Sequence, residues 1–108
     1  APFHCQVMKP AAEEIKDLIM NLSMKNPLIP IVSNVTAEAV TQADEVKQLL
    51  IQQIYKRVRW REIIEYMFKN SNDSFLEIGP GKALSGMLKR FKKEIEIKNY
   101  NNREDLEL

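Results

Sequence analysis

The sequence predicts an α/β fold in which helices cover a parallel sheet. Four segments of the 108 residues repeat apolar side chains at helical spacing, and three have the composition or the alternation of strands. They follow one another in the order helix, strand, helix, helix, strand, helix, strand. No tight hairpin sequence joins two of the strands, so we expect parallel pairing through helical crossovers. A chain of this length, without a repeat or a linker, fits one small domain.

The first half of the chain predicts a helix, a strand and a loop. Pro10 suits the first turn of a helix that we expect over residues 10–24. The apolar residues of this helix follow at positions i, i+3, i+4 and i+7, and they are Ile15, Leu18, Ile19 and Leu22. Residues 28–35 are mostly apolar and predict a strand, whose Pro30 indicates a sheet edge or a bulge. Residues 36–43 are expected to form a loop.

Two helices come next. The second helix is expected to begin at Asp44, a favourable N-cap residue, and to end near Tyr55. Its apolar face consists of Val46, Leu49, Leu50 and Ile54. A third helix carries the apolar residues from Trp60 to Phe68 and stops at the polar residues 70–73.

The last third of the chain predicts a strand, a turn, a helix and a strand. Residues 75–78 read as a short strand, and Gly79-Pro80-Gly81 makes a tight turn into the fourth helix. The apolar face of that helix consists of Leu84, Met87, Leu88 and Phe91. Residues 95–100 alternate with period two, which predicts the last strand.

Composition favours neither a nucleic-acid nor a membrane partner. Apolar residues make up 44% of the chain and charged residues 29%, and the net charge of +1 gives no global field. Cys5 is the only cysteine, and no secretory or membrane-spanning segment is present, so we expect a cytoplasmic protein. Because the chain starts with Ala1 rather than methionine, we also expect a fragment, a processed product or a chain whose beginning is absent.

His4 is the only histidine and the first candidate for a catalytic residue. Histidine is the side chain that titrates unaided near neutral pH, which suits a general base. A base needs a nucleophile, but the chain has no Gly-x-Ser-x-Gly turn, because Ala83 stands where Ser85 would need its first glycine. The sequence therefore predicts half of an active site, and the alternative is a structural or surface histidine.

Gln53 supports the catalytic interpretation of His4. It lies on the apolar face of the second helix, where an unsatisfied amide costs about 1–3 kcal/mol. One interpretation is that its amide bonds to a neighbouring loop backbone. The other is that Gln53 fixes the tautomer of a nearby imidazole.

Two further motifs are weak candidates for chemistry. Gly79-Pro80-Gly81-Lys82 resembles an anion-binding turn, but it lacks the spacing of a phosphate loop and the Ser or Thr after the lysine, so a structural turn is favoured. Cys5 is a poor partner for His4, since consecutive side chains seldom face each other, and we expect it to serve in packing.

Two clusters of basic residues have no assigned partner. The first cluster consists of Lys56, Arg57, Arg59 and Arg61, and the second of Lys89, Arg90, Lys92 and Lys93. An aromatic residue lies within each cluster, a pattern that also occurs in nucleic-acid binding, but the net charge of +1 argues against that partner. Solvated helix faces are the simplest interpretation, and docking of an acidic protein is the alternative.

Several motifs resemble one enzyme family in order and spacing, over nearly the whole chain. They are Pro2-Phe3-His4-Cys5, Met8-Lys9-Pro10-Ala11, residues 29–35, Gln53-Ile54-Tyr55, Val58, Trp60, Glu65-Tyr66-Met67 and the run from Phe75 to Lys82 with Leu84 and Gly86. Together they resemble the C-terminal part of malonyl-CoA:acyl-carrier-protein transacylase. The resemblance implies that residues 1–108 are the C-terminal segment of one catalytic domain of α/β-hydrolase-like fold.

The resemblance also implies a mechanism. In that family a serine on a Gly-x-Ser-x-Gly turn takes malonyl from malonyl-CoA, and the phosphopantetheine thiol of acyl carrier protein then cleaves the ester. The residue matching His4 takes and returns the proton, and the residue matching Gln53 orients the imidazole through its backbone carbonyl. No cofactor is implied, since malonyl-CoA and the carrier are substrates.

The parts of the family pattern that are missing from the chain also matter. The serine, the arginine that holds the malonyl carboxylate, the oxyanion-hole groups and a ferredoxin-like subdomain lie upstream in the family, so we expect this chain to need that upstream part and to be inactive alone. The implied pathway is type II fatty-acid synthesis. The alternatives are an acyltransferase for another acyl-CoA, of the polyketide type, and a non-catalytic remnant or interaction module of the same fold.

Overall fold

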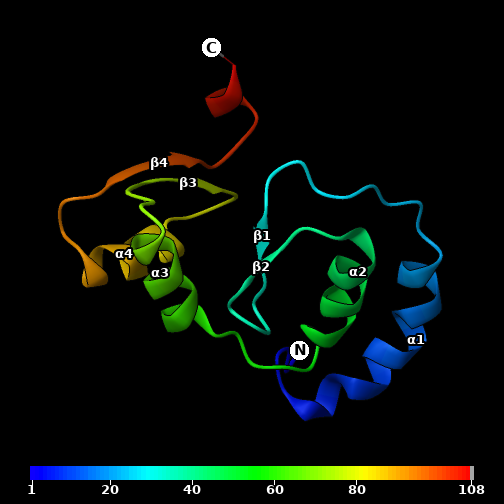
Figure 1. Cartoon of the computed structure of the whole chain (residues 1–108). Coiled ribbons are helices and arrows are strands. Elements are labelled where there is room, and N and C mark those ends of the chain that lie inside the picture. The colour runs from blue at the N-terminus through cyan, green and yellow to red at the C-terminus, as the bar shows by residue number, and fades with distance from the viewer. Residues whose placement is uncertain (108) are drawn as a thin grey trace. The chain divides into compact units, whose positions relative to one another are not determined.

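A computed structural model of the chain describes residues 1–107, which form two compact units, residues 1–66 and residues 67–107. The first unit contains a 3-10 helix (Gln6–Met8), α1 (Lys9–Met20), β1 (Ile31–Val32), β2 (Ala39–Val40), α2 (Ala43–Gln52) and the start of α3 (Trp60–Lys69) (Figure 1). The second unit contains the end of α3, β3 (Ser74–Ile78), α4 (Ala83–Phe91), β4 (Glu96–Tyr100) and a second 3-10 helix (Glu104–Leu106).

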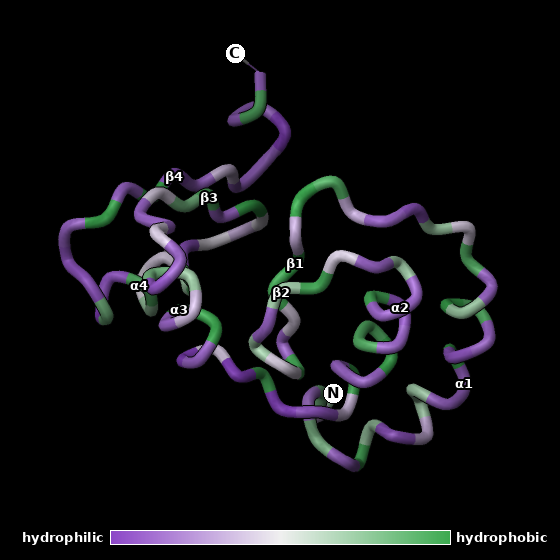
Figure 2. Tube along the Cα trace, in the orientation of Figure 1, coloured by the Kyte–Doolittle hydropathy of each residue, from purple (hydrophilic) through white to green (hydrophobic). Residues whose placement is uncertain are grey.

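In the first unit, α1 packs against α2, and the two helices lie side by side (Figure 1). Apolar residues recur among the polar residues of both helices, and their helical spacing gives each helix one face suited to burial (Figure 2). Ala12 is the buried residue of α1, while Val46 and Ile51 are buried in α2. Lys47 is also buried, and its Nζ donates to the carbonyl of Met20 at 3.2 Å. This bond satisfies a carbonyl that the last turn of α1 leaves free.

A residue distant in sequence caps the start of α2. The N–H of Ala43 donates to Oδ1 of Asn26 at 2.8 Å, whereas Gln42, at the N-cap position, makes no side-chain bond. The prediction that Asp44 is the cap was therefore wrong, although Asp44 lies in the first turn, where its charge favours the helix. A side-chain cap of this kind stabilises a helix by about 1 kcal/mol.

The prediction that all strands pair in parallel was wrong for the first two. β1 and β2 are antiparallel, with Ile31 opposite Val40, and residues 39–40 were expected to be loop. The turn between them closes with a bond from the N–H of Ser33 to the carbonyl of Glu38, and Ala37 adopts a φ of 56°. Because that left-handed residue is an alanine rather than a glycine or asparagine, the sequence does not show a hairpin signal.

The first helix and the first strand are shorter than predicted. α1 ends at Met20 rather than near residue 24, and β1 covers two residues rather than 28–35. Pro27 and Pro30 cannot donate to a ladder, and Leu28 and Ile29 between them are 102% and 78% exposed. Apolar composition alone therefore predicted too long a strand.

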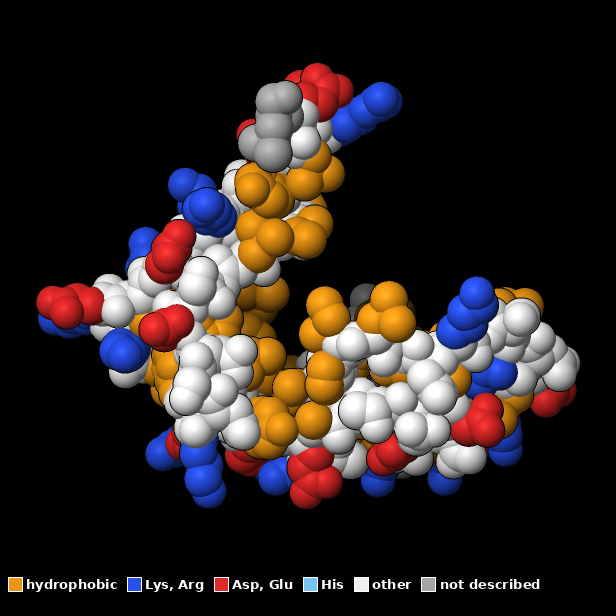
Figure 3. Space-filling view, turned by 45° about the horizontal axis from the view of Figure 1, so that its top comes forward, with side chains coloured by type: hydrophobic (Ala, Val, Ile, Leu, Met, Phe, Trp, Pro, Cys, Tyr) orange, Lys and Arg blue, Asp and Glu red, His pale blue; other side chains and the backbone are white. Residues whose placement is uncertain are grey.

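In the second unit, the predicted parallel pairing is confirmed. β3 and β4 pair in parallel from Ser74 opposite Glu96 onward, and α4 connects them. On one face, Phe75 contacts Phe68 edge to face, with ring centroids 5.8 Å apart. On the other, Leu76 and Ile78 are 50% and 71% exposed. Figure 3 shows that apolar side chains reach the surface among the charged ones. Parallel sheets are usually covered on both faces, so this face is an unpartnered surface.

The carboxylate of Glu77 joins both strands to α4. It accepts hydrogen bonds from the backbone N–H groups of Leu84 at 3.2 Å and Ser85 at 2.9 Å. The Ser85 hydroxyl and the Asn99 amide donate to the same carboxylate. Glu77 thereby satisfies N–H groups that the first turn of α4 leaves free.

This network predicts a pH-dependent stability. The Ser85 hydroxyl and the surrounding N–H groups hold the pKa of Glu77 below its ordinary value of 4.5. A depressed pKa contributes stability above the ordinary value, and that contribution is lost as pH falls through the folded-state pKa. We expect Glu77→Gln to lower the free energy of unfolding near neutral pH, and the difference from the parent to shrink in acid. Urea unfolding at a series of pH values measures this.

The matched control is Glu96→Gln on β4, whose exposed carboxylate has no hydrogen-bond partner among residues 1–107. This change should leave the unfolding free energy nearly the same at every pH. An equal loss for Glu77→Gln at neutral and acidic pH would contradict a role for its charge.

Candidate functional site

His4 is attached to the C-terminal end of α2 by two hydrogen bonds. Its backbone N–H donates to the carbonyl of Ile54 at 2.9 Å, and its Nδ1 lies 2.7 Å from the carbonyl oxygen of Gln53. The carbonyls of Leu49, Ile51 and Gln52 accept N–H groups of residues 53–56 in the closing turn of α2, whereas those of Gln53 and Ile54, just after the helix, accept the donors of His4. His4 itself has a φ of 65°, in the left-handed region that few residues other than glycine adopt. Such a conformation is held by its surroundings and often marks a functional position.

The contact with Gln53 sets the tautomer of the imidazole. A carbonyl oxygen only accepts hydrogen bonds, so Nδ1 carries the proton in the neutral ring and Nε2 has a free lone pair. The ring is exposed, so Nε2 is open to a reacting group. When Nε2 takes a proton, the Nδ1–H bond to the carbonyl becomes charge-assisted and stronger. This arrangement suits a general base that later returns its proton.

The structure brings together the two residues singled out in the sequence, but through a different atom of Gln53. The interaction with the ring uses the backbone carbonyl rather than the side-chain amide. α2 ends at Gln52, and Gln53 is its C-cap, so the predicted end near Tyr55 was too late. The side-chain amide of Gln53 has no hydrogen-bond partner in the part of the chain that the structure describes.

A cleft of about 210 Å³ lies in the same unit, between β1, β2 and α2. Its walls are mostly apolar and include Ile31, Val40, Val46 and Leu50. Gln53 also lines it, together with Asn34. The residue that holds His4 therefore borders a cavity.

The structure does not support a chemical role for the glycine turn, for Ser85 or for Cys5. Gly79 and Gly81 have φ values of 130° and 86°, which explains the glycines of this turn. Since the Glu77 carboxylate occupies the start of α4, the turn is not arranged for a phosphate. Ser85 is 5% exposed and its hydroxyl is engaged by Glu77, so it is not a free nucleophile. Cys5 was expected to pack, but it is exposed and its Sγ donates to the carbonyl of Pro2 at 3.0 Å.

The two basic clusters differ in how their charges are paired. In the first cluster, Arg57 and Arg59 each lie 3.6 Å from a carboxylate oxygen of Glu62, and Arg61 lies 3.1 Å from Glu65. A hydrogen bond from its own backbone, together with the two arginines, holds the pKa of Glu62 below its usual range.

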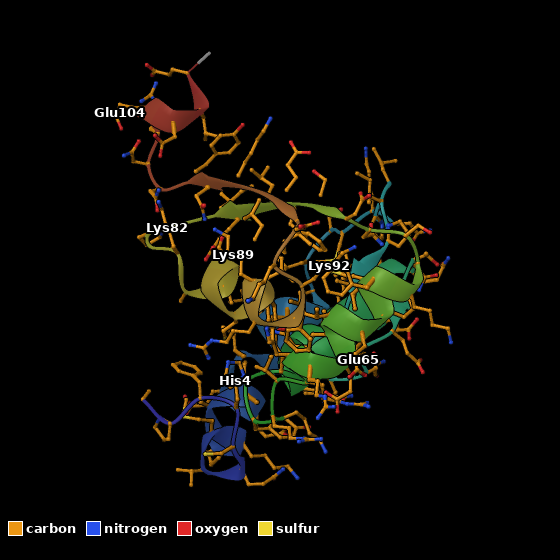
Figure 4. All side chains as sticks on the ribbon, turned by 90° about the vertical axis from the view of Figure 1, so that its left-hand side faces the viewer. His4, Glu65, Lys82, Lys89, Lys92 and Glu104 are labelled. Carbon is orange, nitrogen blue, oxygen red and sulfur yellow. The ribbon has the colours of Figure 1, made fainter. Side chains whose placement is uncertain are left out.

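The second cluster forms no ion pair among residues 1–107, and Lys92 instead lies over the ring of Phe68 at 5.9 Å. Figure 4 shows Lys89 on α4 and Lys92 just beyond its end. The second cluster is therefore the more available positive surface of the two.

Comparisons with known proteins agree with the motifs. No family model matches the chain. The malonyl-CoA:acyl carrier protein transacylase of Bacillus subtilis is 37% identical over 107 residues, which cover 99% of this chain and 34% of that protein. The crystal structure of the acyl-carrier-protein S-malonyltransferase of Bartonella henselae is 36% identical, with a TM-score of 0.88 over 99% of this chain and 34% of the other. The chain matches the C-terminal part of the malonyl-CoA:acyl carrier protein transacylase family.

The match to the transacylases confirms the resemblance and the α/β fold class. The chain spans about a third of the length of the curated relatives that it matches. Another similar structure is a malonyl-transacylase in complex with the acyl-carrier protein of a type II polyketide synthase, at 32% identity and a TM-score of 0.87, covering 98% of this chain and 34% of that one. Within residues 1–107, no helix has the length and apolar character needed to cross a bilayer.

Sequence reasoning missed two contributors to the candidate site. The carbonyl of Ile54 fixes the backbone of His4, and no residue type signals a backbone acceptor. Asn26 caps the start of α2, the helix that Gln53 directly follows, yet the Asn-Pro pair indicated only a helix end. The preference of asparagine for N-caps was the available signal.

The contact between His4 and Gln53 predicts which nitrogen of the imidazole ring carries the proton. We expect the neutral imidazole of His4 to carry its proton on Nδ1, because the acceptor is a carbonyl. Long-range proton–nitrogen correlation NMR distinguishes the two tautomers. Gln53→Ala keeps the backbone carbonyl and should leave the Nδ1-protonated form dominant. Loss of that form in Gln53→Ala would show that the side-chain amide holds the ring.

Proposed function

We propose that the complete protein transfers malonyl from malonyl-CoA to acyl carrier protein in type II fatty-acid synthesis, and that this chain supplies the general base. The observation that carries the proposal is the bond from His4 Nδ1 to the Gln53 carbonyl, within a chain that matches the transacylases over 99% of its length. The proposed compartment is the cytoplasm, in keeping with a single cysteine in the sequence.

The proposed proton path uses Nε2 of His4 twice. As a serine outside this chain attacks the thioester carbonyl, Nε2 takes the hydroxyl proton, and the imidazolium gives it to the departing CoA thiolate. In the second half, Nε2 takes the proton of the carrier thiol, whose sulfur attacks the malonyl ester. The serine oxygen leaves and takes the proton back. Nucleophilic catalysis of this kind needs a base within hydrogen-bond reach of the nucleophile.

Neither Ser85 nor Cys5 is placed as an activated nucleophile in the described residues. Ser85 is engaged by Glu77, and Cys5 follows His4 directly and donates to Pro2. The proposal therefore requires the remainder of the transacylase domain, which in the relatives accounts for about two-thirds of the length.

The first test compares the chain alone with the complete protein. We expect residues 1–108 alone to transfer no malonyl, and His4→Ala in the complete protein to slow acylation by about 10²–10⁴-fold, the usual effect of removing a general base. Stopped-flow measurement of CoA release reports the acylation step directly.

Cys5→Ala is the matched control, because it alters the adjacent exposed residue and should leave acylation unchanged. Transfer by the chain alone, or acylation unchanged in His4→Ala, would contradict the proposed role. Activity with a branched acyl-CoA in preference to malonyl-CoA would favour the polyketide-type alternative. A complete protein that binds carrier but transfers nothing would favour the non-catalytic module.

The second cluster is the proposed docking surface for the acidic carrier. Its exposed residues Lys89, Arg90, Lys92 and Lys93 lie in and just after the last turn of α4. Their charges have no carboxylate partner among residues 1–107, whereas Glu62 and Glu65 partly neutralise the first cluster. A free positive surface steers an acidic partner more strongly than a compensated one.

Charge reversal tests this docking surface. Changing the second cluster to glutamate in the complete protein should raise the KM for the carrier and leave the KM for malonyl-CoA unchanged. The defect should shrink as salt rises, since such steering is screened beyond about 8 Å at physiological salt. Reversal of Arg57 and Arg61 in the first cluster is the comparison, with a smaller expected effect. Equal effects, or none at low salt, would remove the second cluster from carrier docking.

A further inference from the structure

We propose that the side-chain amides of Asn34 and Gln53 bind the pantetheine arm that CoA and the carrier share, in the cleft between β1, β2 and α2. This inference rests on the proposed transfer reaction and extends it to two substrate-binding residues. In this assignment Gln53 has two roles: its backbone carbonyl orients His4, and its side chain contacts the substrate.

Some polar groups of the cleft already have hydrogen-bond partners within the described part of the chain, whereas others have none there and can bind a ligand. The buried hydroxyl of Ser33 accepts the N–H of Val35 at 3.0 Å, so it already has a partner in its own turn. Asn34 uses its backbone carbonyl to accept the N–H of Arg59 at 3.0 Å. The side-chain amides of Asn34 and Gln53 have no hydrogen-bond partner among residues 1–107, although both residues are half-buried. A half-buried primary amide without a partner is available to a ligand, because each amide both donates and accepts.

The walls and these amides together match the chemistry of the pantetheine arm. That arm alternates short methylene segments with two secondary amides, and each of these needs both a donor and an acceptor. The walls of the cleft are apolar at Ile31, Val40 and Val46, which suits the methylenes. Ligand sites commonly combine an apolar wall with a few convergent polar groups.

The position of Gln53 sets the direction of the arm. Its carbonyl contacts the ring of His4, where the thioester must react, so its side chain is assigned to the amide nearer the sulfur. Asn34, which lines the same cleft without contacting the ring, is assigned to the farther amide. The competing occupant of this cleft is polypeptide from the remainder of the transacylase domain, and the test separates the two.

Kinetics with truncated substrates test the assignment in the complete protein. Malonyl-pantetheine carries both amides, whereas malonyl-N-acetylcysteamine carries only the one nearer the sulfur. We expect Gln53→Ala to raise the KM about three- to tenfold for both substrates, the loss of one ordinary hydrogen bond. Asn34→Ala should raise the KM for malonyl-pantetheine by a similar factor and leave that for malonyl-N-acetylcysteamine unchanged. In neither variant should the pH profile of kcat move, because the carbonyl that holds His4 remains.

Gln52→Ala is the matched control, since Gln52 is the neighbouring residue of α2 and lines other grooves. Unchanged KM values for both truncated substrates in Asn34→Ala and Gln53→Ala would overturn the inference. So would a loss of folding stability with unaltered KM, which would identify polypeptide as the occupant.

A binding measurement on residues 1–108 separates this inference from the proposed function. Titration of the ¹⁵N-labelled chain with pantetheine should shift the side-chain NH₂ resonances of Asn34 and Gln53 and leave those of Gln52 in place. No shift, or an equal shift of Gln52, would contradict the inference. Failure of malonyl transfer by the complete protein would contradict the proposed function instead, since the titration does not depend on catalysis.

Discussion

The candidate site depends on the two backbone carbonyls that directly follow the C-terminal end of α2. The carbonyls of Leu49, Ile51 and Gln52 accept N–H groups of residues 53–56 within the closing turn, whereas those of Gln53 and Ile54 need donors from elsewhere in the chain. His4 supplies two, its backbone N–H to Ile54 and its Nδ1–H to Gln53. Each partner satisfies the other, because the two carbonyls gain donors and the histidine gains a fixed backbone and a fixed tautomer. Both bonds help to hold His4 at its φ of 65°.

The position of that helix end is itself determined by the rest of the first unit. Asn26 caps the first turn of α2, and Lys47 joins the middle of the helix to the last carbonyl of α1. α1 begins five residues after His4 and α2 ends next to Gln53, so the two residues in contact adjoin one packed helix pair. A change that loosens this pair would move His4 relative to its acceptor, even without touching either residue.

The sequence was sufficient to predict features that depend on the types of the residues. It was insufficient for features that depend on backbone conformation or on backbone hydrogen bonds. Helical periodicity predicted the α-helices α1 to α4. The Gly79–Gly81 turn was predicted from its glycines, and the parallel β3–β4 pair from the order of the elements. The β1–β2 hairpin was missed because Ala37 takes a conformation that its residue type does not announce. The partnership of His4 with Gln53 was predicted, but reasoning from the residues alone assigned it to the amide. Every residue has a backbone carbonyl, so the sequence does not show which one accepts a bond, and only the resemblance indicated the correct atom.

A neutral carbonyl as the partner of the histidine has a chemical consequence. In a serine–histidine–aspartate arrangement, a carboxylate stabilises the imidazolium that forms as the base takes its proton. A carbonyl orients the ring equally well but offers only a partial charge, so it stabilises the imidazolium less. The proposed reaction exchanges one thioester for another through an ester, and the same nitrogen must take and return a proton in each half. A base whose protonated form is only moderately stabilised gives the proton back readily, which suits a reversible transfer better than a one-way hydrolysis.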